Sequence, residues 1–441
     1  MQKEVFRRFA AMYKRLLVFA VVLALLAIGI GATSQPTVAQ MKIVYNSYAS
    51  DPIPRAYTEQ LVANWNAANP DMPVELNIIN HEDFKQAIRT YLVAEPAPDV
   101  LDWFAGNRAQ FFISRGLIAD FSDVWESEGW DEVYPAGFKA LATVDDKQYF
   151  LPNNYYWWAL YFRPSILADA GLEAPQTWDD LLNACRVLND KGIIPITIGT
   201  KAPWPAAAWF DYINMRLNGP QFHLDLMLLK ESYTDPRVKA TFMKWKELFD
   251  NKCYIPDSAA LEWGDALTPM AQGKAAMYLM GGFITDSWQL AAAGDEALMA
   301  DLDFTRFPII DPMMPVGEDA PTDGVFLAAK AGNLEMAKKF LAYMGSQEVA
   351  QRGVDELGRL PVRTDVSTER FTDAQKKGIS LIQSADMVVQ FYDRDTTPEM
   401  AERGLNAFAS FFADPSEANI DALLADLEET RARLAAEQAN E

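Results

Sequence analysis

The stretch Leu151-Pro-Asn-Asn-Tyr-Tyr-Trp-Trp-Ala-Leu-Tyr-Phe162 does most to decide the fold of this chain. Asn153 and Asn154 lie in a tight turn that runs directly into a series of aromatic rings. The two amides offer hydrogen-bond donors and acceptors without charge, and Tyr and Trp offer flat apolar faces with polar edges. This combination suits a sugar, which carries hydroxyls around its edge and C–H groups on its faces. It is equally typical of a buried strand, because aromatic residues favour strands and cores.

Residues 1–39 have the pattern of a secretory signal peptide. Five basic residues (Lys3, Arg7, Arg8, Lys14 and Arg15) precede the apolar run 16–30, and the small residues Thr37-Val-Ala39 then predict cleavage before Gln40. A membrane-spanning helix needs roughly 20 apolar residues, so this run is too short to anchor the chain. No cysteine lies near the cleavage point to carry a lipid. We therefore expect a soluble periplasmic protein.

The composition of the remaining chain limits its partners. The formal net charge of −22 includes five basic residues and one acidic residue in the leader, so the 402 residues that follow carry −26. Nucleic acid is an unsuitable partner for such a chain, because its binding depends on Lys and Arg neutralising phosphates. The length predicts two domains of ordinary size.

Cysteine and histidine are both scarce. Cys185 and Cys253 could form a disulfide in an oxidising compartment or remain two buried thiols. With only His81 and His223, a His-built zinc site or a Ser-His-Asp triad is hard to assemble, and we expect no metal and no cofactor. His81 follows an apolar strand and could meet a ligand, whereas His223 is expected to be structural.

Strands and helices alternate in the first part of the chain. Strands are predicted at 42–46, 73–80 and 98–103, with helices at 56–69 and 82–94 between them. This order predicts an α/β fold with a mostly parallel sheet and helices on both faces. Ligands of such sheets bind beyond the carboxyl ends of the strands, which brings together five candidates: Tyr48, His81, Trp103, Asn107 and Arg108.

A second alternating unit follows the opening stretch. Its predicted elements are helices at 177–191, 203–217 and 235–251 with strands at 193–198 and 274–280. Further helices are predicted at 333–343, at 374–382 and from 420 to the end. No flexible linker is evident, so a hinge between the two units must consist of ordered strands.

Fragments spread over nearly the whole chain resemble one family, the extracellular solute-binding proteins of carbohydrate ABC transporters, which includes maltose-binding protein. Each fragment is weak alone, but their order and spacing are specific. They are Ala97-Pro-Asp-Val-Leu-Asp-Trp103, Ser114-Arg-Gly-Leu-Ile-Ala-Asp120, Lys147-Gln-Tyr-Phe-Leu-Pro152, Leu160-Tyr-Phe-Arg163, Gly171-Leu172, Pro175-Gln-Thr-Trp-Asp-Asp180, Gly192-Ile-Ile-Pro-Ile196, Ala271-Gln-Gly-Lys-Ala-Ala-Met277, Gly281-Gly282, Ala337-Lys-Lys-Phe-Leu341 and Leu360-Pro361.

The resemblance implies the two-lobed periplasmic-binding-protein fold (type II), with the ligand cleft between two α/β lobes. Lobe 1 would comprise residues 41–151 and 307–364, and lobe 2 residues 152–306 and 365–441. The implied function is capture of a neutral mono- or oligosaccharide by hinge closure and its delivery to the permease subunits of an ABC importer. We expect a monomer with no catalytic activity.

The resemblance also implies residues for the site. Trp103, Asn107 and Arg108 match the lobe 1 contact, Asn154 and Tyr156 match the crossover, and Trp204 matches an aromatic of lobe 2. Gly282 and Phe283 match a Gly-x-Trp turn, with Phe in place of Trp. The other candidates are Asp323 and Arg359 in loops, Tyr392 and Arg394 near the C-terminal segment, and Trp158 as a third residue of the crossover. Tyr155 and Trp157 are expected to pack inside.

Two other functions are compatible with these residues. A secreted carbohydrate-active enzyme would need paired carboxylates, for which Asp99 with Asp102 and Asp393 with Asp395 are the candidates. A binder of an anionic ligand such as a glycerol phosphate would share the fold, but it would need more basic groups than Arg108, Arg359 and Arg394 supply.

Overall fold

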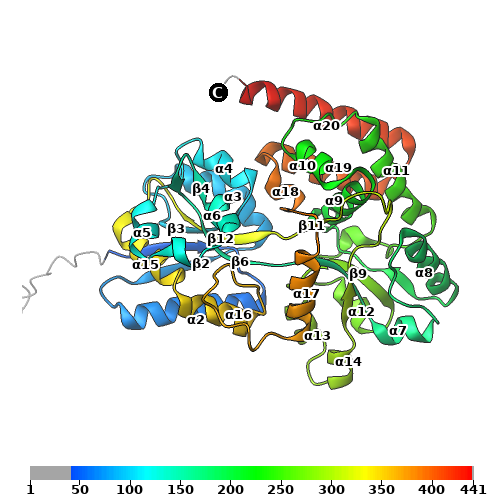
Figure 1. The fold of residues 1–441 in the computed structure, drawn as a ribbon, viewed down its shortest axis with the longest axis horizontal. Coiled ribbons are helices and arrows are strands. Elements are labelled where there is room, and N and C mark those ends of the chain that lie inside the picture. Colours follow the sequence, from blue (N-terminus) through cyan, green and yellow to red (C-terminus); the bar gives the residue numbers. More distant parts are fainter. Residues whose placement is uncertain (1–40, 440–441) are drawn as a thin grey trace, which may run out of the picture. The chain divides into compact units, whose positions relative to one another are not determined.

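The computed structural model describes residues 41–439. The predicted signal peptide, residues 1–39, lies outside this range. Two sheets organise the described chain (Figure 1). The first has the order β2-β1-β3-β12-β6, formed by Val74–Ile78, Ile43–Ser47, Val100–Phe104, Thr322–Leu327 and Leu151–Tyr155. The second has the order β10-β7-β9-β8, formed by Asp303–Thr305, Trp158–Phe162, Ala275–Gly281 and Ile194–Ile196.

Both sheets are mixed and less parallel than the sequence predicts: two of the four described strand pairings in the first sheet are parallel, and one of the three in the second. In the first sheet β1 pairs in parallel with β2 and β3, and β12 runs antiparallel to β3 and β6. In the second sheet β8 and β9 are parallel, and β7 runs antiparallel to β9 and β10. Two short ribbons complete the strands: β4 (Thr143–Val144) with β5 (Lys147–Gln148), and β11 (Gly317–Asp319) with β13 (Met387–Val389).

Helices cover both faces of the first sheet. Successive side chains along its strands point to opposite faces, and apolar side chains lie on both. On β12, Val325 and Leu327 join the core beneath Leu61 and Phe340, whereas Phe326 joins the core on the other face beneath Phe84. The helices of this lobe are α2 (Pro52–Ala68), α3 (His81–Val93), α4 (Asn107–Ile113), α5 (Ser122–Ser127), α6 (Ala136–Ala142), α15 (Leu334–Met344) and α16 (Gln347–Leu357), with a 3-10 turn at Trp130–Glu132.

The second sheet is surrounded by a larger set of helices that share one core. Its central helix α9 is apolar on nearly all sides, which is typical of a helix buried inside a domain. The helices of this set, α9 among them, are α7 (Pro164–Asp169), α8 (Trp178–Asp190), α9 (Trp204–Asn218), α10 (Pro220–Met227), α11 (Pro236–Asp250), α12 (Leu267–Ala271), α13 (Ile284–Ala291), α14 (Glu296–Ala300), α17 (Asp373–Gln383), α18 (Tyr392–Asp395), α19 (Pro398–Ala413) and α20 (Glu417–Gln438), with a 3-10 turn at Ser258–Ala260.

The helix boundaries follow local capping chemistry. Thr177 and Asp180 form a capping box at the start of α8, and Thr372 and Gln375 form another at the start of α17. The C-terminal helices α19 and α20 pack beside α9 and α11 (Figure 1). The last segment of the chain therefore packs against the helices around the second sheet.

The opening stretch joins the two sheets. Leu151–Tyr155 forms β6 of the first sheet, and Trp158–Phe162 forms β7 of the second, so Tyr156 and Trp157 make the connection. The chain passes between the sheets again between Thr305 and Thr322. The assignment of whole segments to the two lobes, with boundaries at 152, 307 and 365, stays a prediction.

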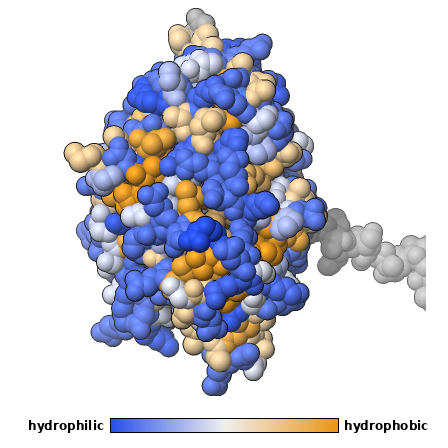
Figure 2. All heavy atoms as spheres, turned by 90° about the vertical axis from the view of Figure 1, so that its right-hand side faces the viewer, coloured by the Kyte–Doolittle hydropathy of each residue, from blue (hydrophilic) through white to orange (hydrophobic). Residues whose placement is uncertain are grey.

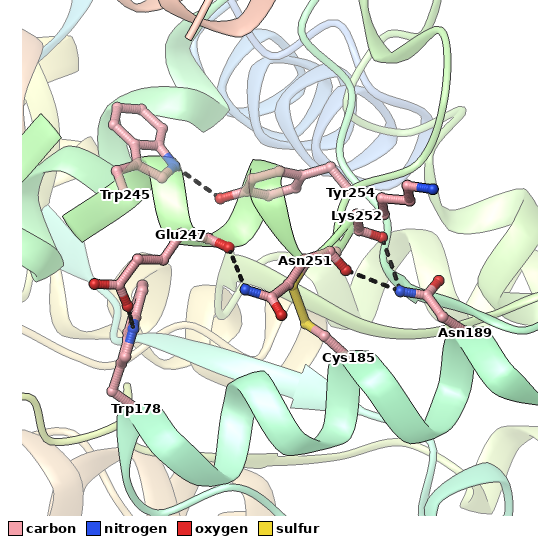
Figure 3. Close-up of a disulfide and its surroundings, with 9 residues drawn as sticks. Trp178, Cys185, Asn189, Trp245, Glu247, Asn251, Lys252 and Tyr254 are labelled. Atoms are coloured by element: carbon pink, nitrogen blue, oxygen red, sulfur yellow. Dashed lines mark hydrogen bonds between the residues drawn. A yellow bond between two sulfur atoms is a disulfide. The ribbon is translucent and has the colours of Figure 1, made fainter. Parts of the chain in front are cut away.

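Cys185 and Cys253 form a disulfide, which settles a question that the sequence leaves open. It ties α8 to the segment after α11, and hydrogen bonds from Asn189 to the carbonyls of Asn251 and Lys252 reinforce the same junction (Figure 3). Both cysteines are fully buried. The second lobe thus has a covalent link inside its helical layer.

Polar residues predominate on the face that Figure 2 shows, with apolar residues in separate patches between them. Within residues 41–439, no helix is both long and apolar enough to cross a bilayer.

Candidate ligand-binding site

A cavity of about 740 Å³ lies where the two sheets approach each other, around the connection between β6 and β7. Its size falls within the range of roughly 300–1,000 Å³ that is usual for small-molecule sites. Residues from both lobes line it, including Tyr48 and Asp323 from the first and Trp204 and Phe283 from the second.

The strand registers explain why the crossover residues meet the cavity. Asn154 pairs with Asp323 across β6 and β12, and Trp158 pairs with Gly281 across β7 and β9. The amide of Asn154 therefore lies beside the carboxylate of Asp323, and Trp158 lies beside the turn that carries Phe283. Asn154 Oδ1 and Trp158 Nε1 have no hydrogen-bond partner among the described residues.

Aromatic rings from the second lobe form one wall of the cavity, which we call the aromatic wall. Trp204 contacts the rings of Trp158, Trp263 and Phe283 at centroid distances of 6.1, 6.2 and 6.1 Å. Phe283 also lies edge-on to Tyr156 at 5.3 Å. Phe283 thus provides a ring where the family turn has Trp, so an aromatic contact is retained at this position.

Arg394 forms the opposite, polar side of the cavity. Its guanidinium donates to Asp323 at 2.7 Å and to the hydroxyl of Tyr156 at 2.8 Å, and it lies over the ring of Phe104 at 4.7 Å. Burial alone would lower the pKa of Arg394, but the negative charge of Asp323 raises it above its usual value. The guanidinium thus holds Tyr156 in place beside Asp323.

A second ion pair joins the two lobes at the cavity. Arg359 follows α16 in the first lobe and donates to Asp286 on α13 in the second lobe at 2.8 Å. The two side chains are only 12% and 11% exposed. Burial raises the pKa of Asp286, and the positive charge of Arg359 opposes that rise.

Several further charges of the cavity are also paired. Lys85 contacts Asp393 at 2.7 Å and Glu82 at 3.1 Å, and His81 contacts Glu82 at 3.0 Å. Burial would raise the pKa of Glu82, but the Lys85 ammonium and the bond from His81 lower it well below its usual range. His81 lies edge-on to Tyr48 at 4.7 Å, so both residues are fixed at the rim.

Nine of the residues predicted for the site line the cavity. They are Tyr48, His81, Asn154, Tyr156, Trp204, Phe283, Asp323, Arg359 and Arg394. Trp158, predicted as a third residue of the crossover, lines it as well. Trp157 is 2% exposed and packs against Gly282 and Phe304, away from the cavity.

The other five predicted residues do not line the cavity. Trp103 is fully buried between the first sheet and α4, because alternation along β3 directs its neighbour Asp102 to the cavity instead. Tyr392 is fully buried, and its hydroxyl contacts that of Tyr233 at 2.9 Å. Both aromatic residues were predicted at the ligand, but they belong to the core.

Asn107, Arg108 and Gly282 support the site from outside. Arg108 donates to the backbone carbonyl of Asp393 at 3.3 Å and so helps to hold α18, which carries Arg394. Asn107 begins α4 and is half-buried. Gly282 donates its N–H to the carbonyl of Trp157 at 2.8 Å, and a Cβ there would meet the indole of Trp157 at 3.3 Å.

Sequence reasoning missed several lining residues. Trp263, Asp286 and Asp51 lie in segments without a recognisable motif, and Lys85 is one of several charges on an ordinary amphipathic helix. Trp263 and Asp286 lie in acidic and aromatic segments on either side of Gly281, and that composition is the signal that could have predicted them. Among residues 41–439, no group of three or more His, Cys, Asp or Glu side chains is arranged to hold a metal ion.

Two α/β lobes, a cavity between them and strands as the connection define a two-lobed binding protein. Comparison with known families makes the assignment specific: residues 49–351 match the family of bacterial extracellular solute-binding proteins, and the chain belongs to this family. The family match covers both sides of the cavity.

Individual relatives agree with this assignment. An uncharacterized ABC transporter extracellular-binding protein of Pyrococcus horikoshii is 24% identical over 92% of both chains. The multiple sugar-binding protein of Streptococcus mutans is 21% identical over 83% of this chain and 89% of its own. The structure of the bacterial solute receptor AcbH, described as having an exclusive preference for β-D-galactopyranose, is 29% identical with a TM-score of 0.81, and the match covers 89% of this chain and 99% of that one.

Proposed function

We propose that this protein is the extracytoplasmic binding component of a carbohydrate ABC importer and that it captures a neutral sugar between its lobes. The observation that carries the proposal is the pairing of every cation in the cavity. Each lysine and arginine that lines it within residues 41–439 has an acidic partner: Lys85, Lys201, Arg359, Arg363 and Arg394. A neutral ligand is favoured because no unpaired positive charge is available to hold an anion.

The charge balance of the lining disfavours an anionic ligand further. Among the described residues, eight carboxylates and five Lys or Arg side chains line the cavity. An anion placed there would meet net repulsion in a partly desolvated space, where charges interact more strongly than in water. Binding of a glycerol phosphate is therefore the weaker alternative.

Aromatic stacking and hydrogen bonding by neutral groups support a sugar as the ligand. The aromatic wall offers apolar faces to the C–H side of a pyranose. Asn154 Oδ1 and Trp158 Nε1 are a buried acceptor and a buried donor of cavity-lining residues, and they have no partner among the described residues. Closure that brings them against the sugar would let them bond hydroxyls that would each cost roughly 1–3 kcal/mol if left unpaired.

We propose that the nine predicted residues in the cavity and Trp158 contact the ligand. Closure of the lobes over it would be a hinge motion at the strands near Tyr156 and Trp157, with the ligand selecting the closed state. The loaded protein would then dock as a monomer on the permease subunits, outside the cytoplasm, after removal of residues 1–39.

An enzymatic function is the weaker alternative because the candidate carboxylates are engaged elsewhere. Asp99 accepts the N–H groups of Val44 and Asn333, and Asp102 accepts the hydroxyls of Tyr45 and Ser47. Asp393 is paired with Lys85, and Asp395 accepts the N–H of Gln390. General acid–base chemistry on a glycoside needs two carboxyl groups free to face the substrate.

Thermal unfolding with a panel of mono- and disaccharides tests the proposal. A sugar present at a hundred times its dissociation constant should stabilise the protein by about 2.7 kcal/mol, and it should be recovered intact. Sugar phosphates should give no shift. Recovery of cleaved sugar would contradict a pure binding function, and stabilisation by the phosphate alone would favour the anionic alternative.

A further inference from the structure

The cavity continues from the cleft into the first lobe, where residues of helices α2 and α16 line it. These two helices lie side by side (Figure 1). We call this extension the apolar arm. Three residues of α2 and three of α16 define it: Pro54, Tyr57, Leu61, Ala350, Gly353 and Val354. Arg359, which follows α16, and the residues of the cleft line the same cavity, so the arm and the cleft form one space.

Four polar side chains that line the cavity with the arm are engaged within the protein. The hydroxyl of Tyr57 donates to the carbonyl of Val349 at 3.1 Å, and that of Thr58 donates to the carbonyl of Pro54 at 2.9 Å. The hydroxyl of Tyr134 donates to the carbonyl of Pro152 at 3.3 Å. The guanidinium of Arg363 is taken up by Asp365 and the carbonyl of Gly345.

The arm and the cleft therefore differ in chemistry. In the cleft, Asn154 and Trp158 have polar atoms without partners among the described residues, whereas the hydroxyls of the arm are satisfied. A sugar hydroxyl placed in the arm would lose its bonds to water without replacement. An apolar group would gain from leaving water, and spaces lined by aliphatic side chains accept such groups.

We propose that the apolar arm holds the apolar aglycone of a glycoside whose sugar lies in the cleft. This inference rests on the proposed sugar-binding function and narrows its ligand class to alkyl or aryl glycosides. The geometry supports it because one continuous cavity joins the cleft, which has both aromatic rings and polar side chains, to the apolar arm. A plain oligosaccharide would have to place hydroxyls against the apolar arm.

Two small residues on α16 keep the arm open. A Cβ at Gly353 would meet nothing closer than the hydroxyl of Tyr57 at 3.6 Å, which is an ordinary contact distance. Ala350 lines the same space one helical turn earlier. A leucine at either position would occupy the arm, and Gly353→Leu should not unfold α16 because glycine is a poorer helix former than leucine.

Titration calorimetry with alkyl glycosides tests the proposal. The probes are the methyl, n-butyl and n-octyl glycosides of glucose and galactose, in both anomers and below their micelle concentrations. For the sugar that binds as its methyl glycoside, affinity should rise roughly fourfold for each methylene that enters the arm. Gly353→Leu and Ala350→Leu should abolish the rise and leave the methyl glycoside within about twofold of its normal affinity.

Glu348→Leu is the matched control, because it adds the same side chain to an exposed position of α16 outside the cavity. In this variant the affinity should still rise with the length of the alkyl group, as in the natural protein. If methyl glycosides bind but longer chains bring no gain, or if the gain survives both leucine variants, the proposal is overturned and the sugar-binding function stands. The proposal would also be overturned if a second sugar ring increased the affinity and Gly353→Leu removed that increase. If no glycoside binds and no sugar of the mono- and disaccharide panel stabilises the protein, the proposed function itself fails.

Discussion

Trp204 and Trp157 show how one type of side chain takes two roles within the same region. Trp204 is half-buried in the aromatic wall, whereas Trp157 is 2% exposed and packs between Gly282, Gly378 and Phe304. The first ring can meet a ligand, and the second fills the space where the lobes are joined. Truncating each ring should therefore have a different consequence.

Trp204→Ala should weaken sugar binding by roughly tenfold or more, because a stacking face is lost, and should leave the fold intact. Trp157→Ala should lower the free energy of unfolding by about 3–5 kcal/mol, because it leaves a cavity in a packed core. Titration calorimetry and urea denaturation measure the two effects. If Trp204→Ala fails to fold, its ring belongs to the core.

Asp395 gives the protein a specific response to pH. Burial raises its pKa to about 6, although the N–H groups of Gln390 and Asn107 and the charge of Arg394 oppose the rise. In the unfolded chain the group titrates near 3.9. Between these values the folded protein binds more protons than the unfolded chain, so this group's contribution to stability falls as the pH rises from about 4 to 6.

Asp395→Asn removes that contribution. Stability measured by urea unfolding should therefore decline less, or rise more, between pH 4 and pH 6 in the variant than in the natural chain. A shift of about two pKa units corresponds to about 3 kcal/mol. Identical pH profiles for the two proteins would show that Asp395 titrates normally in the folded state.

At the scale of elements, the ion pair between Arg359 and Asp286 connects α13 with the segment that follows α16. Each partner belongs to a different lobe, so the pair can form only when the lobes are close. We expect it to stabilise the closed arrangement. Removing one partner would leave the other charge buried and unpaired, which is costly.

A double-mutant cycle measures this coupling. Asp286→Asn and Arg359→Gln should each weaken sugar binding, and the double variant should lose less than the sum of the two losses. The expected interaction energy is about 1–3 kcal/mol. Strictly additive losses would show that the two residues act on the ligand independently and do not link the lobes.

The disulfide between α8 and the segment after α11 is a second stabilising contact between elements. Its cysteines are 68 residues apart, and closing a loop of that length should stabilise the folded state by roughly 4 kcal/mol. The double variant Cys185→Ala, Cys253→Ala should lose about this much in urea unfolding with little change in sugar affinity, because both residues lie outside the cavity. A strong loss of affinity would indicate that the second lobe is distorted.

Elements could be predicted well from the sequence because their signals are local. The helix expected at 235–251 is observed at Pro236–Asp250, and the strand expected at 274–280 is observed at Ala275–Gly281. The direction of individual side chains is harder to predict. Trp103 and Asp102 are adjacent on β3, and which of them faces the cavity depends on how α3 and α4 pack on the sheet.

At the scale of the whole molecule, the order of weak fragments along the chain identified the two-lobed fold and the family correctly. Pairing between distant charges could not be foreseen. Arg359 and Asp286 are 73 residues apart, and Lys85 and Asp393 are 308 residues apart. Such pairs form only when the chain has folded and its distant segments meet. They are nevertheless the basis for the proposal that the ligand is neutral.

Titration calorimetry of the natural chain with neutral sugars and their phosphate esters, followed by mass spectrometry of the recovered ligand, tests the central claim most directly. The account predicts saturable binding of one intact neutral sugar per protein chain, weakened by Trp204→Ala, and no binding of its phosphate. Tighter binding of the phosphate, or recovery of a cleaved sugar, would contradict it.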